Sequence, residues 1–559
     1  MTDQHLRSNF EPGTTRWAVR RAQWLAMGLS EEDLMKPKIA VVNSSSKLSV
    51  CFQHLDDVSE AVQAGIRAAG GVPFEIRTVA PSDFITSAGR QGRYLMPTRD
   101  LLVNDVEVQV EGAVLDGMIL LSSCDKTTPA HLMAAGRLDI PALILTCGYQ
   151  LGGNCAGRHV DIETLYNSVG ALKAGQIDLA DLKAMSCQAI TGPGVCAGMA
   201  TANSMHVTAE ALGMTLPGNA PIRAASPRLH DYAGRAGARI VEMVGEGLTA
   251  RKILTPAAFH NAVTVAISLG CSVNVVRHLI AAAIEAEAEF DVLDAFDRLG
   301  RDLPQITQVR PNGPTRIEEL DAAGGCAGAM RQLCGTLDLS AMTASGRPLG
   351  EVLDQVAPPD EEVIRPLSRP FRDEPGLVVL RGSLAPEGAI VKLSAVPKDV
   401  RLFQGPARVF EDESDAIAGL ADGTIRKGDV IVLRMLGPKG GPGTVFAASF
   451  MAALVGAGLG AQVAVITDGE LSGLNSGITV GQVMPEAAEG GPLAVVRDGD
   501  PVRIDMTART LSLDIADDDF SERLATHQVT LSDEKPGWLR FYRELVQPLR
   551  QGAVLGRRT

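Results

Sequence analysis

Four short apolar runs along the chain have the length and composition of buried parallel strands. They are KIAVVNSSS (38–46), DGMILLSS (116–123), PALILTCG (141–148) and AQVAVITDG (461–469). Alanine-rich segments lie between these runs and repeat apolar residues at helical spacing, as in 54–71 and 272–290. Strands that alternate with helices are typical of an α/β fold with a mainly parallel sheet. We therefore predict that fold class for the chain.

A proline-rich, charged stretch divides the chain into two parts. Residues 358–376 contain five prolines and many charged side chains, a composition typical of a linker. Beyond it, residues 377–396 and 428–436 are rich in strand-forming residues with turn signals. At 559 residues the chain is too long for one compact core. We predict an α/β domain over residues 1–365 and a smaller, β-rich domain over residues 375–559.

Composition and charge restrict the classes of partner. The chain has a net charge of −14, whereas nucleic-acid binding calls for a basic face, so we expect no nucleic-acid partner. The N-terminus lacks the apolar segment of a secretory signal, and the longest apolar stretch, 451–466, is too short and too glycine-rich to span a bilayer comfortably. We therefore expect a cytoplasmic protein without a membrane partner.

Side chains that can bind metals follow three of the predicted strands. In open α/β sheets, ligands gather at the carboxyl ends of the strands. Cys51 follows the first strand, and a glycine-rich loop before a helix of small residues contains Cys196. The remaining candidates are Cys124, Asp125 and Lys126 after the second strand, and Asp468, Glu470 and Ser472 after a late one. Together these segments predict one site that is assembled from distant parts of the chain.

Seven of the nine cysteines fall into two groups by their surroundings. A free cysteine is most often a small buried hydrophobic residue. The residues interpreted in this way are Cys147, Cys271, Cys326 and Cys334. Cys51, Cys124 and Cys196 instead stand in polar or glycine-rich turns, and no CxxC spacing supports a zinc site. Three such cysteines can hold an iron–sulfur cluster and leave one iron position open, but buried thiols without a metal also fit their spacing.

Asp125 and Lys126 are adjacent at the mouth of a predicted buried strand. Such a pair is usually an exposed ion pair, but at this place Asp125 would be a good ligand for a hard cation. Lys126 cannot bind a metal as an ammonium and would have to be deprotonated or carbamylated. Asp83 is a candidate second carboxylate. Ser472 lies in a glycine-containing loop without a GxSxG motif, so a triad hydrolase is not indicated.

Several segments resemble the dihydroxy-acid dehydratase and 6-phosphogluconate dehydratase family of iron–sulfur hydro-lyases, which includes sugar-acid dehydratases. The matching phrases are NSSSKLSVCFQHL, SSCDKTTP, TGPGVCAGMATANSM, LRGSLAPEGAIVK, LRMLGPKGGPG, TDGELSG, PEAAEGGPLAVVRDGD and GWLRFY. They follow the family's order from about residue 15 to residue 543. The resemblance implies a C-terminal domain with β-barrel character, an active site between the two domains, and a homodimer or homotetramer.

The resemblance also assigns roles to the candidate residues. They are Cys51, Cys124 and Cys196 as cluster ligands, Asp83, Asp125 and a carbamylated Lys126 as Mg²⁺ ligands, and Ser472 as the catalytic base. The presence of Cys51 favours a [2Fe-2S] cluster. The implied substrate is a small polyhydroxy carboxylate whose 3-hydroxyl would bind the open iron, while Mg²⁺ would hold its carboxylate and 2-oxygen. Ser472, activated by a nearby cation, would take the C2 proton, and loss of water would give an enol that becomes a 2-keto acid.

Two positions depart from the family pattern. Members commonly carry a glutamate shortly after GPKGGPG that contributes to the Mg²⁺ site, whereas Phe446 stands at that position here. A phenyl ring cannot bind Mg²⁺, so water or another residue such as Glu470 would have to replace the glutamate. The proline-glycine pair that usually follows the CDK motif is replaced by Pro129 and Ala130.

These departures leave two interpretations of the function. The first is a dehydratase that acts on a sugar acid or on a branched-chain dihydroxy acid, and the altered metal motif slightly favours the sugar acid. The second is a non-catalytic homologue that keeps a cluster as a sensor or assembly partner. Phe446 supports the second interpretation, whereas the retained Ser472 argues against it.

Overall fold

The N-terminal part of the chain is built on a parallel four-stranded sheet. The computed structural model describes residues 6–86, 88–173, 175–471 and 477–556. Strands β1 (Lys38–Asn43), β2 (Val72–Arg77), β3 (Gly117–Ser122) and β4 (Ala142–Thr146) lie in the order β2-β1-β3-β4, with parallel neighbours. The residues of β1, β3 and β4 are all buried, as expected for a sheet covered on both faces. Three of the predicted apolar runs therefore form this sheet.

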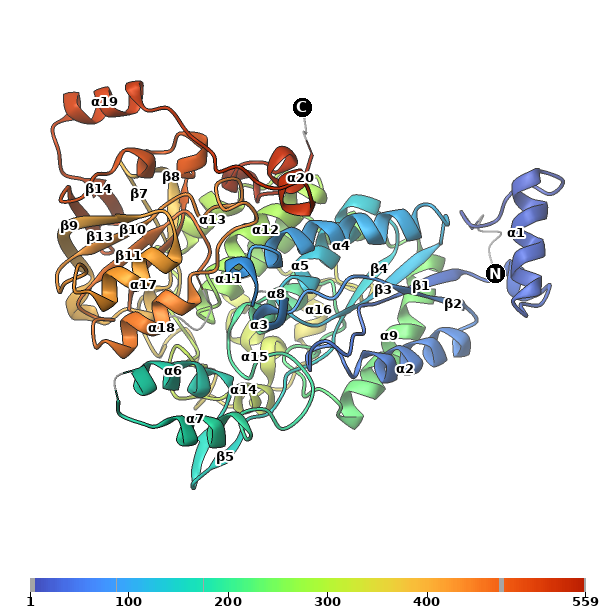
Figure 1. The fold of residues 1–559 in the computed structure, drawn as a ribbon. Coiled ribbons are helices and arrows are strands. Elements are labelled where there is room, and N and C mark those ends of the chain that lie inside the picture. The colour runs from blue at the N-terminus through green and yellow to red at the C-terminus, as the bar shows by residue number, and fades with distance from the viewer. Residues whose placement is uncertain (1–5, 87, 174, 472–476, 557–559) are drawn as a thin grey trace.

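Helices cover both faces of the sheet (Figure 1). Helices α2 (Leu55–Ala68) and α9 (Pro227–Glu246) pack against each other on one side. Helices α4 (Leu95–Val110) and α5 (Thr127–Leu138) pack together on the other side. The predicted helical segment 54–71 is α2.

A set of buried helices lies between the sheet and the C-terminal part. It contains α8 (Thr201–Ala211), α11 (Pro256–Ser268) and α12 (Asn274–Glu285). All 11 residues of α8 are buried. Because α12 contacts both α5 and α8, it links the helices of the sheet to the centre of the molecule. The predicted helical segment 272–290 contains α12.

The C-terminal part is a closed barrel, seen on the left of Figure 1. Its strand order is β10-β11-β12-β8-β7-β14-β13-β9, and β9 to β12 are parallel neighbours. The strands are β7 (Val378–Gly382), β8 (Ala385–Val391), β9 (Leu402–Phe410), β10 (Val430–Leu433), β11 (Ala464–Thr467), β12 (Ile478–Met484), β13 (Pro501–Asp505) and β14 (Thr510–Leu513). The predicted strand at 461–469 contains β11, and the proline-rich stretch 358–376 precedes β7. The predicted α/β class with a C-terminal part of β-barrel character is confirmed.

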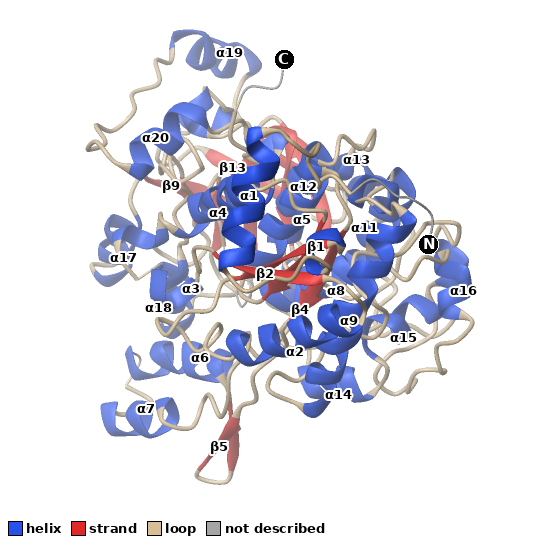
Figure 2. Ribbon diagram, turned by 90° about the vertical axis from the view of Figure 1, so that its right-hand side faces the viewer, coloured by secondary structure: helices blue, strands red, loops and turns tan. Residues whose placement is uncertain are grey.

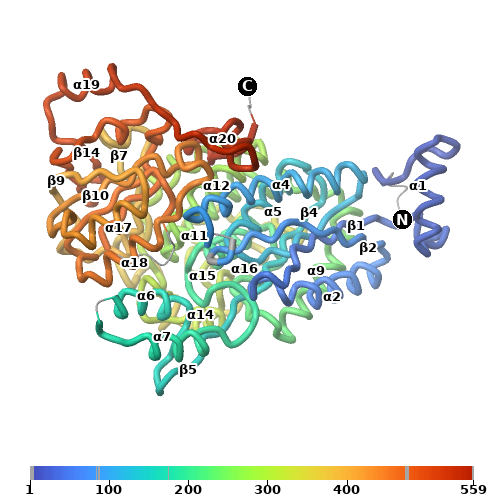
Figure 3. The backbone as a smooth tube through the Cα atoms, in the orientation of Figure 1, coloured from blue at the N-terminus to red at the C-terminus, as the bar shows by residue number. Residues whose placement is uncertain are grey.

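The end of the chain returns to the N-terminal part (Figure 3). Helix α20 (Trp538–Leu545) lies near α4, where the buried side chains of Tyr542 and Met96 belong to one apolar cluster. Arg99 of α4 donates a hydrogen bond to the carbonyl oxygen of Ala553 at 2.7 Å. These contacts hold the C-terminal segment against the helices of the sheet.

Shorter elements complete the fold, and Figure 2 shows α1 nearest the viewer at the end of the sheet. They are α1 (Thr15–Ala26), α3 (Asp83–Thr86), β5 (Gly153–Cys155), β6 (Arg158–Val160), α6 (Ile162–Lys173), α7 (Leu179–Ser186), α10 (Ala250–Ile253), α13 (Val292–Leu299), α14 (Ile317–Ala322), α15 (Gly325–Gln332), α16 (Leu349–Leu353), α17 (Glu413–Ala421), α18 (Ala448–Gly456) and α19 (Asp517–Thr526). Within the described part of the chain, no helix has the length and apolar character needed to cross a membrane.

Candidate functional site

Three cysteines from separate segments converge beyond the carboxyl ends of β1 and β3. Cys51 lies in the turn between β1 and α2, Cys124 lies between β3 and α5, and Cys196 lies in the loop before α8. The adjacent Cys51 thiol, followed by burial, raises the pKa of Cys124. Burial, followed by the charge of Asp83, raises the pKa of Cys196. Such thiols stay protonated unless a bound metal favours the thiolates, so the three residues fit an iron–sulfur cluster.

Two carboxylates lie directly beside these thiols. One ligand atom from each of Asp83, Cys124 and Asp125 lies within 4.8 Å of the other two. Burial raises the pKa of both carboxyl groups, and the charge of Asp125 adds to the effect on Asp83. Oδ1 of Asp83 is buried and has no hydrogen-bond partner among the described residues. A cation would stabilise both ionised carboxylates and occupy the unused oxygen, so the pair fits a divalent cation.

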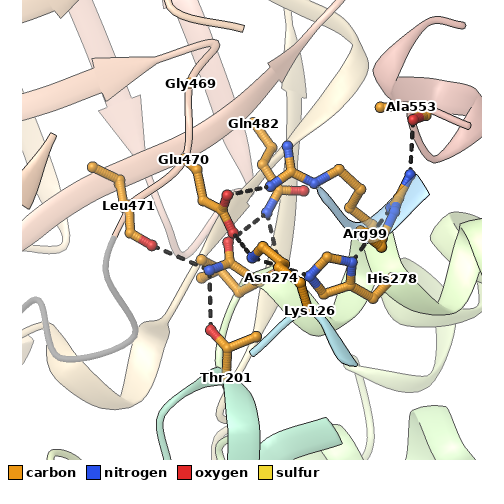
Figure 4. Close-up of polar contacts among 12 residues, drawn as sticks. Arg99, Lys126, Thr201, Asn274, His278, Gly469, Glu470, Leu471, Gln482 and Ala553 are labelled. Atoms are coloured by element: carbon orange, nitrogen blue, oxygen red, sulfur yellow. Dashed lines mark hydrogen bonds and ion pairs between the residues drawn. The ribbon is translucent and has the colours of Figure 1, made fainter. Parts of the chain in front are cut away.

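Lys126 lies at the centre of a buried polar network (Figure 4). Its Nζ donates to Oε1 of Glu470 at 2.7 Å and lies 3.4 Å from Nε2 of His278. The second oxygen of Glu470, Oε2, lies 3.1 Å from Nη2 of Arg277. Burial opposes the ionisation of Glu470, but the charges of Lys126 and Arg277 outweigh it and lower the pKa of this carboxyl group. Glu470 is therefore a carboxylate held between two buried cations.

His278 has a hydrogen-bond donor on each side of its ring. Its Nδ1 lies 3.4 Å from Nη1 of Arg99, which is always charged, and its Nε2 faces Lys126. Burial, followed by the charge of Lys126, lowers the pKa of His278, so the ring is neutral with one donor and one acceptor nitrogen. Because both neighbours are donors, one of the two contacts joins two donors whichever tautomer the ring adopts. An acceptor at the end of Lys126 would remove this mismatch.

The segment that leads into position 472 is held by α12. Nδ2 of Asn274 donates to the carbonyl oxygen of Leu471 at 3.3 Å and to Oγ1 of Thr201 at 3.1 Å (Figure 4). Burial raises the pKa of Asp125, and the nearby Thr201 side chain opposes this shift. Asn274 and Thr201 therefore lie between Leu471 and the paired carboxylates.

The structure brings six of the seven predicted site residues into one region. They are Cys51, Asp83, Cys124, Asp125, Lys126 and Cys196. The seventh, Ser472, lies outside the described residues. The roles of all seven stay predictions.

Two interpretations of individual residues are corrected. Cys334 is exposed instead of buried, whereas Cys147, Cys271 and Cys326 are buried as predicted. The carboxylate of Asp468 accepts hydrogen bonds from the backbone N–H groups of Leu436 and Ala487, at 2.9 Å each, so it stabilises loops of the barrel.

Sequence reasoning missed three polar residues of α12. Asn274, Arg277 and His278 stand at positions i, i+3 and i+4 of the helix and therefore share one face. The surrounding sequence is apolar and rich in alanine, which indicates a buried helix. A polar stripe on a buried helix is the signal that could have found them, because buried charges need partners.

Phe446, where the resemblance predicts a glutamate, lies beside Glu470. The two residues form a parallel β-bridge, and the backbone N–H of Glu470 donates to the carbonyl oxygen of Val445 at 3.2 Å. The Phe446 side chain is buried, at 7% exposure. Glu470 therefore places a carboxylate on the segment adjacent to the one in which Phe446 stands instead of the expected glutamate.

Comparison with known proteins identifies the family. Residues 36–352 match the family described as dihydroxy-acid/6-phosphogluconate dehydratase N-terminal, and residues 362–553 match its C-terminal counterpart. The chain is 41% identical over 539 residues to the dihydroxy-acid dehydratase of Pyrococcus abyssi, a match that covers 96% of this chain and 97% of that protein. It is 40% identical over 554 residues to the dihydroxy-acid dehydratase of Methanothrix thermoacetophila, covering 98% and 100%. The family implies an iron–sulfur cluster, which agrees with the convergence of the three cysteines. The chain therefore belongs to the dihydroxy-acid/6-phosphogluconate dehydratase family and is a hydro-lyase of that family.

Proposed function

We propose that this protein removes water from a 2,3-dihydroxy carboxylate and releases a 2-keto acid. The observation that carries the proposal is the contact between a soft and a hard set of ligands, in which Cys124, Asp83 and Asp125 approach within 4.8 Å. Thiolates suit iron and carboxylates suit Mg²⁺, so two adjacent metals could act on neighbouring oxygens of one small substrate. The names of the relatives support the same class of reaction.

The proposed cofactors follow from the side chains present. Cys51, Cys124 and Cys196 would hold a [2Fe-2S] cluster, which supplies a Lewis acid for the departing hydroxide. Asp83 and Asp125 would hold Mg²⁺, which supplies positive charge next to the substrate carboxylate. The burial of Cys124 and Asp125, each 3% exposed, keeps bulk water away from both groups.

Lys126 is proposed to be carbamylated. His278 has a donor on each side of its ring, and a carbamate oxygen at the end of Lys126 would give Nε2 an acceptor. Arg99, on the other side of the ring, then fixes the tautomer of His278 by donating to Nδ1. A carbamate on Lys126 would also offer Mg²⁺ an oxygen ligand, which an ammonium cannot do.

Ser472 is proposed as the base that removes the C2 proton. This role rests on the family resemblance and on the position of the preceding Leu471, which Asn274 ties to the site. An ordinary serine hydroxyl is too weak a base, so positive charge nearby must lower its pKa. Loss of the C2 proton and of the C3 hydroxide gives an enol and water, and the enol tautomerises to the 2-keto acid.

An anaerobic assay for 2-keto acid tests the reaction. Cluster-reconstituted protein would be offered 2,3-dihydroxyisovalerate, several aldonates and glycerate, with and without Mg²⁺. We expect turnover of one class, with the aldonates slightly favoured because Phe446 changes the metal motif. Ser472→Ala should lower the rate by at least about a hundredfold while retaining the absorption of the cluster. A cluster-loaded protein that is silent on the whole panel would contradict the proposal and favour a sensor or assembly partner.

The proposed setting is the cytoplasm, with a small polyhydroxy carboxylate as ligand and neither nucleic acid nor membrane as partner. A homodimer or homotetramer is proposed from the family resemblance. Two domains, residues 1–365 and 375–559, are proposed as the folding units. The limits of the two family matches, 352 and 362, support this division.

A further inference from the structure

Glu470, one possible replacement for the glutamate expected at position 446, is a buried carboxylate. It is 2% exposed and faces Lys126 through Oε1 and Arg277 through Oε2. Burial raises the pKa values of Asp83 and Asp125, and neighbouring anions that include Glu470 raise them further. Carboxylates from α3, from the turn before α5 and from the segment after β11 therefore share one region.

Carbamylation of Lys126 would remove the cation that Glu470 contacts. Oε1 of Glu470 accepts from the ammonium at 2.7 Å, whereas a carbamate is itself an anion. Glu470 and the carbamate would then need a cation between them. Asp83, whose Oδ1 is buried and has no hydrogen-bond partner within the described part of the chain, offers an oxygen atom in the same region. A divalent cation bound among these groups would offset their charge. Glu470, which pairs with Lys126 here, is not in the group of ligand atoms within 4.8 Å that Asp83, Cys124 and Asp125 form, so its carboxylate would turn from Lys126 toward the cation.

Arg277 holds the other oxygen of Glu470 and offsets part of its charge. Its side chain is 1% exposed, and Nε and Nη1 have no hydrogen-bond partner among the described residues. A guanidinium buried with so few partners is costly unless its surroundings are strongly negative. Because Nη2 engages Oε2, Oε1 is left to point toward the side of Lys126.

We propose that Glu470 is a third carboxylate ligand of the divalent cation, beside Asp83 and Asp125, and that Arg277 is the positioning residue that orients it. The proposal rests on the proposed function of this site. Because Phe446 and Glu470 form a parallel β-bridge, a carboxylate at either position would lie in the same part of the molecule.

Mn²⁺ binding, followed by the EPR signal of free Mn²⁺, tests the proposal without turnover. Cluster-loaded protein would be treated with a chelator, supplied with bicarbonate and titrated with Mn²⁺. We expect about one Mn²⁺ per chain, and binding at least about tenfold weaker in Glu470→Gln and in the shorter but still charged Glu470→Asp. Adding Phe446→Glu to Glu470→Gln should restore much of the affinity. Glu413→Gln, which changes a buried carboxylate of α17, should leave Mn²⁺ binding unchanged.

Mn²⁺ binding in two variants of Arg277 tests its role separately. At equal Tm and equal cluster absorption, Arg277→Lys should retain Mn²⁺ binding better than Arg277→Met, because a positioning role depends on the charge. Wild-type affinity in Glu470→Gln would overturn the proposal. So would a wild-type protein that binds no Mn²⁺, in which Lys126 stays an ammonium paired with Glu470. Absence of turnover on the substrate panel, with Mn²⁺ binding intact, would contradict the proposed reaction and leave the ligand assignment standing.

Discussion

The two buried cations beside Glu470 allow a direct test of what its carboxylate contributes to stability. Lys126 is 0% exposed and Arg277 is 1% exposed, and each forms an ion pair with a different oxygen of Glu470, at 2.7 and 3.1 Å. In protein freed of metal and bicarbonate, Lys126 carries no carbamate. Glu470→Gln keeps the shape of the side chain but leaves two buried cations without their anion.

The expected loss is several kcal/mol. Removing one partner of a buried ion pair typically costs about 3–5 kcal/mol, because the other charge remains buried and unpaired. The amide oxygen of glutamine can still accept from Lys126, which recovers about 1 kcal/mol. We therefore expect Glu470→Gln to lower the free energy of unfolding by about 3 kcal/mol. Adding Arg277→Leu removes one of the two unpaired cations, so the double variant should regain about half of that loss.

Urea unfolding in carbonate-free buffer with a chelator, followed by far-UV circular dichroism, measures these differences. The control is Glu544→Gln, which breaks an ion pair with Arg540 whose two side chains are 51% and 61% exposed, and which should change stability by less than about 0.5 kcal/mol. If Glu470→Gln is no more harmful than this control, the carboxylate does not compensate the buried cations. A double variant less stable than the single one would also refute the reasoning.

Two further predictions concern the cluster and the pH dependence of stability. Cys124→Ser should abolish the visible absorption of the reconstituted cluster, whereas Cys334→Ser, at an exposed thiol, should retain it; full iron content in Cys124→Ser would contradict the assignment. Glu486 is 1% exposed, and burial followed by the charge of Asp468 raises its pKa from 4.5 to about 8. The folded state keeps this proton after the unfolded state has released it, so the contribution of Glu486 to stability should fall as the pH rises from about 4.5 to about 8. Urea unfolding at several pH values should show a smaller slope in Glu486→Gln, and an unchanged slope would exclude this carboxyl group as its source.

Local sequence patterns were enough to predict the parts of the site that follow from the geometry of a parallel sheet. The apolar runs at 38–46 and 116–123 form adjacent parallel strands, and parallel strands end at one edge of a sheet. Residues that follow such strands must therefore lie close together, which places Cys51 near Cys124 and Asp125. The same reasoning needs no knowledge of the loops in between.

The charged network could not be predicted because its partners are far apart in the chain. Lys126 and Glu470 are separated by 344 positions, and the packing of the C-terminal part against the N-terminal part brings them together (Figure 4). Asp468 and Glu470 flank one glycine and look equivalent in the sequence. The structure separates them, since Asp468 turns toward backbone N–H groups of the barrel and Glu470 turns toward Lys126. No local pattern determines which of two such acids faces the site.

Residues of the site come from both the N-terminal and the C-terminal part of the fold. Glu470 connects the two parts through its ion pairs with Lys126 and Arg277. The predicted cluster and cation ligands all precede residue 200, whereas Glu470 and Ser472 follow β11 of the barrel. Because Lys126 and Arg277 are buried, each is costly without a carboxylate, so their contacts with Glu470 favour the packed arrangement in which the segment up to Leu471 lies against α12. A carboxylate at position 446 could meet the same demand from the neighbouring segment. If Glu470 binds the cation as proposed, an apolar side chain at position 446 is compatible with the site because the adjacent segment supplies the acid.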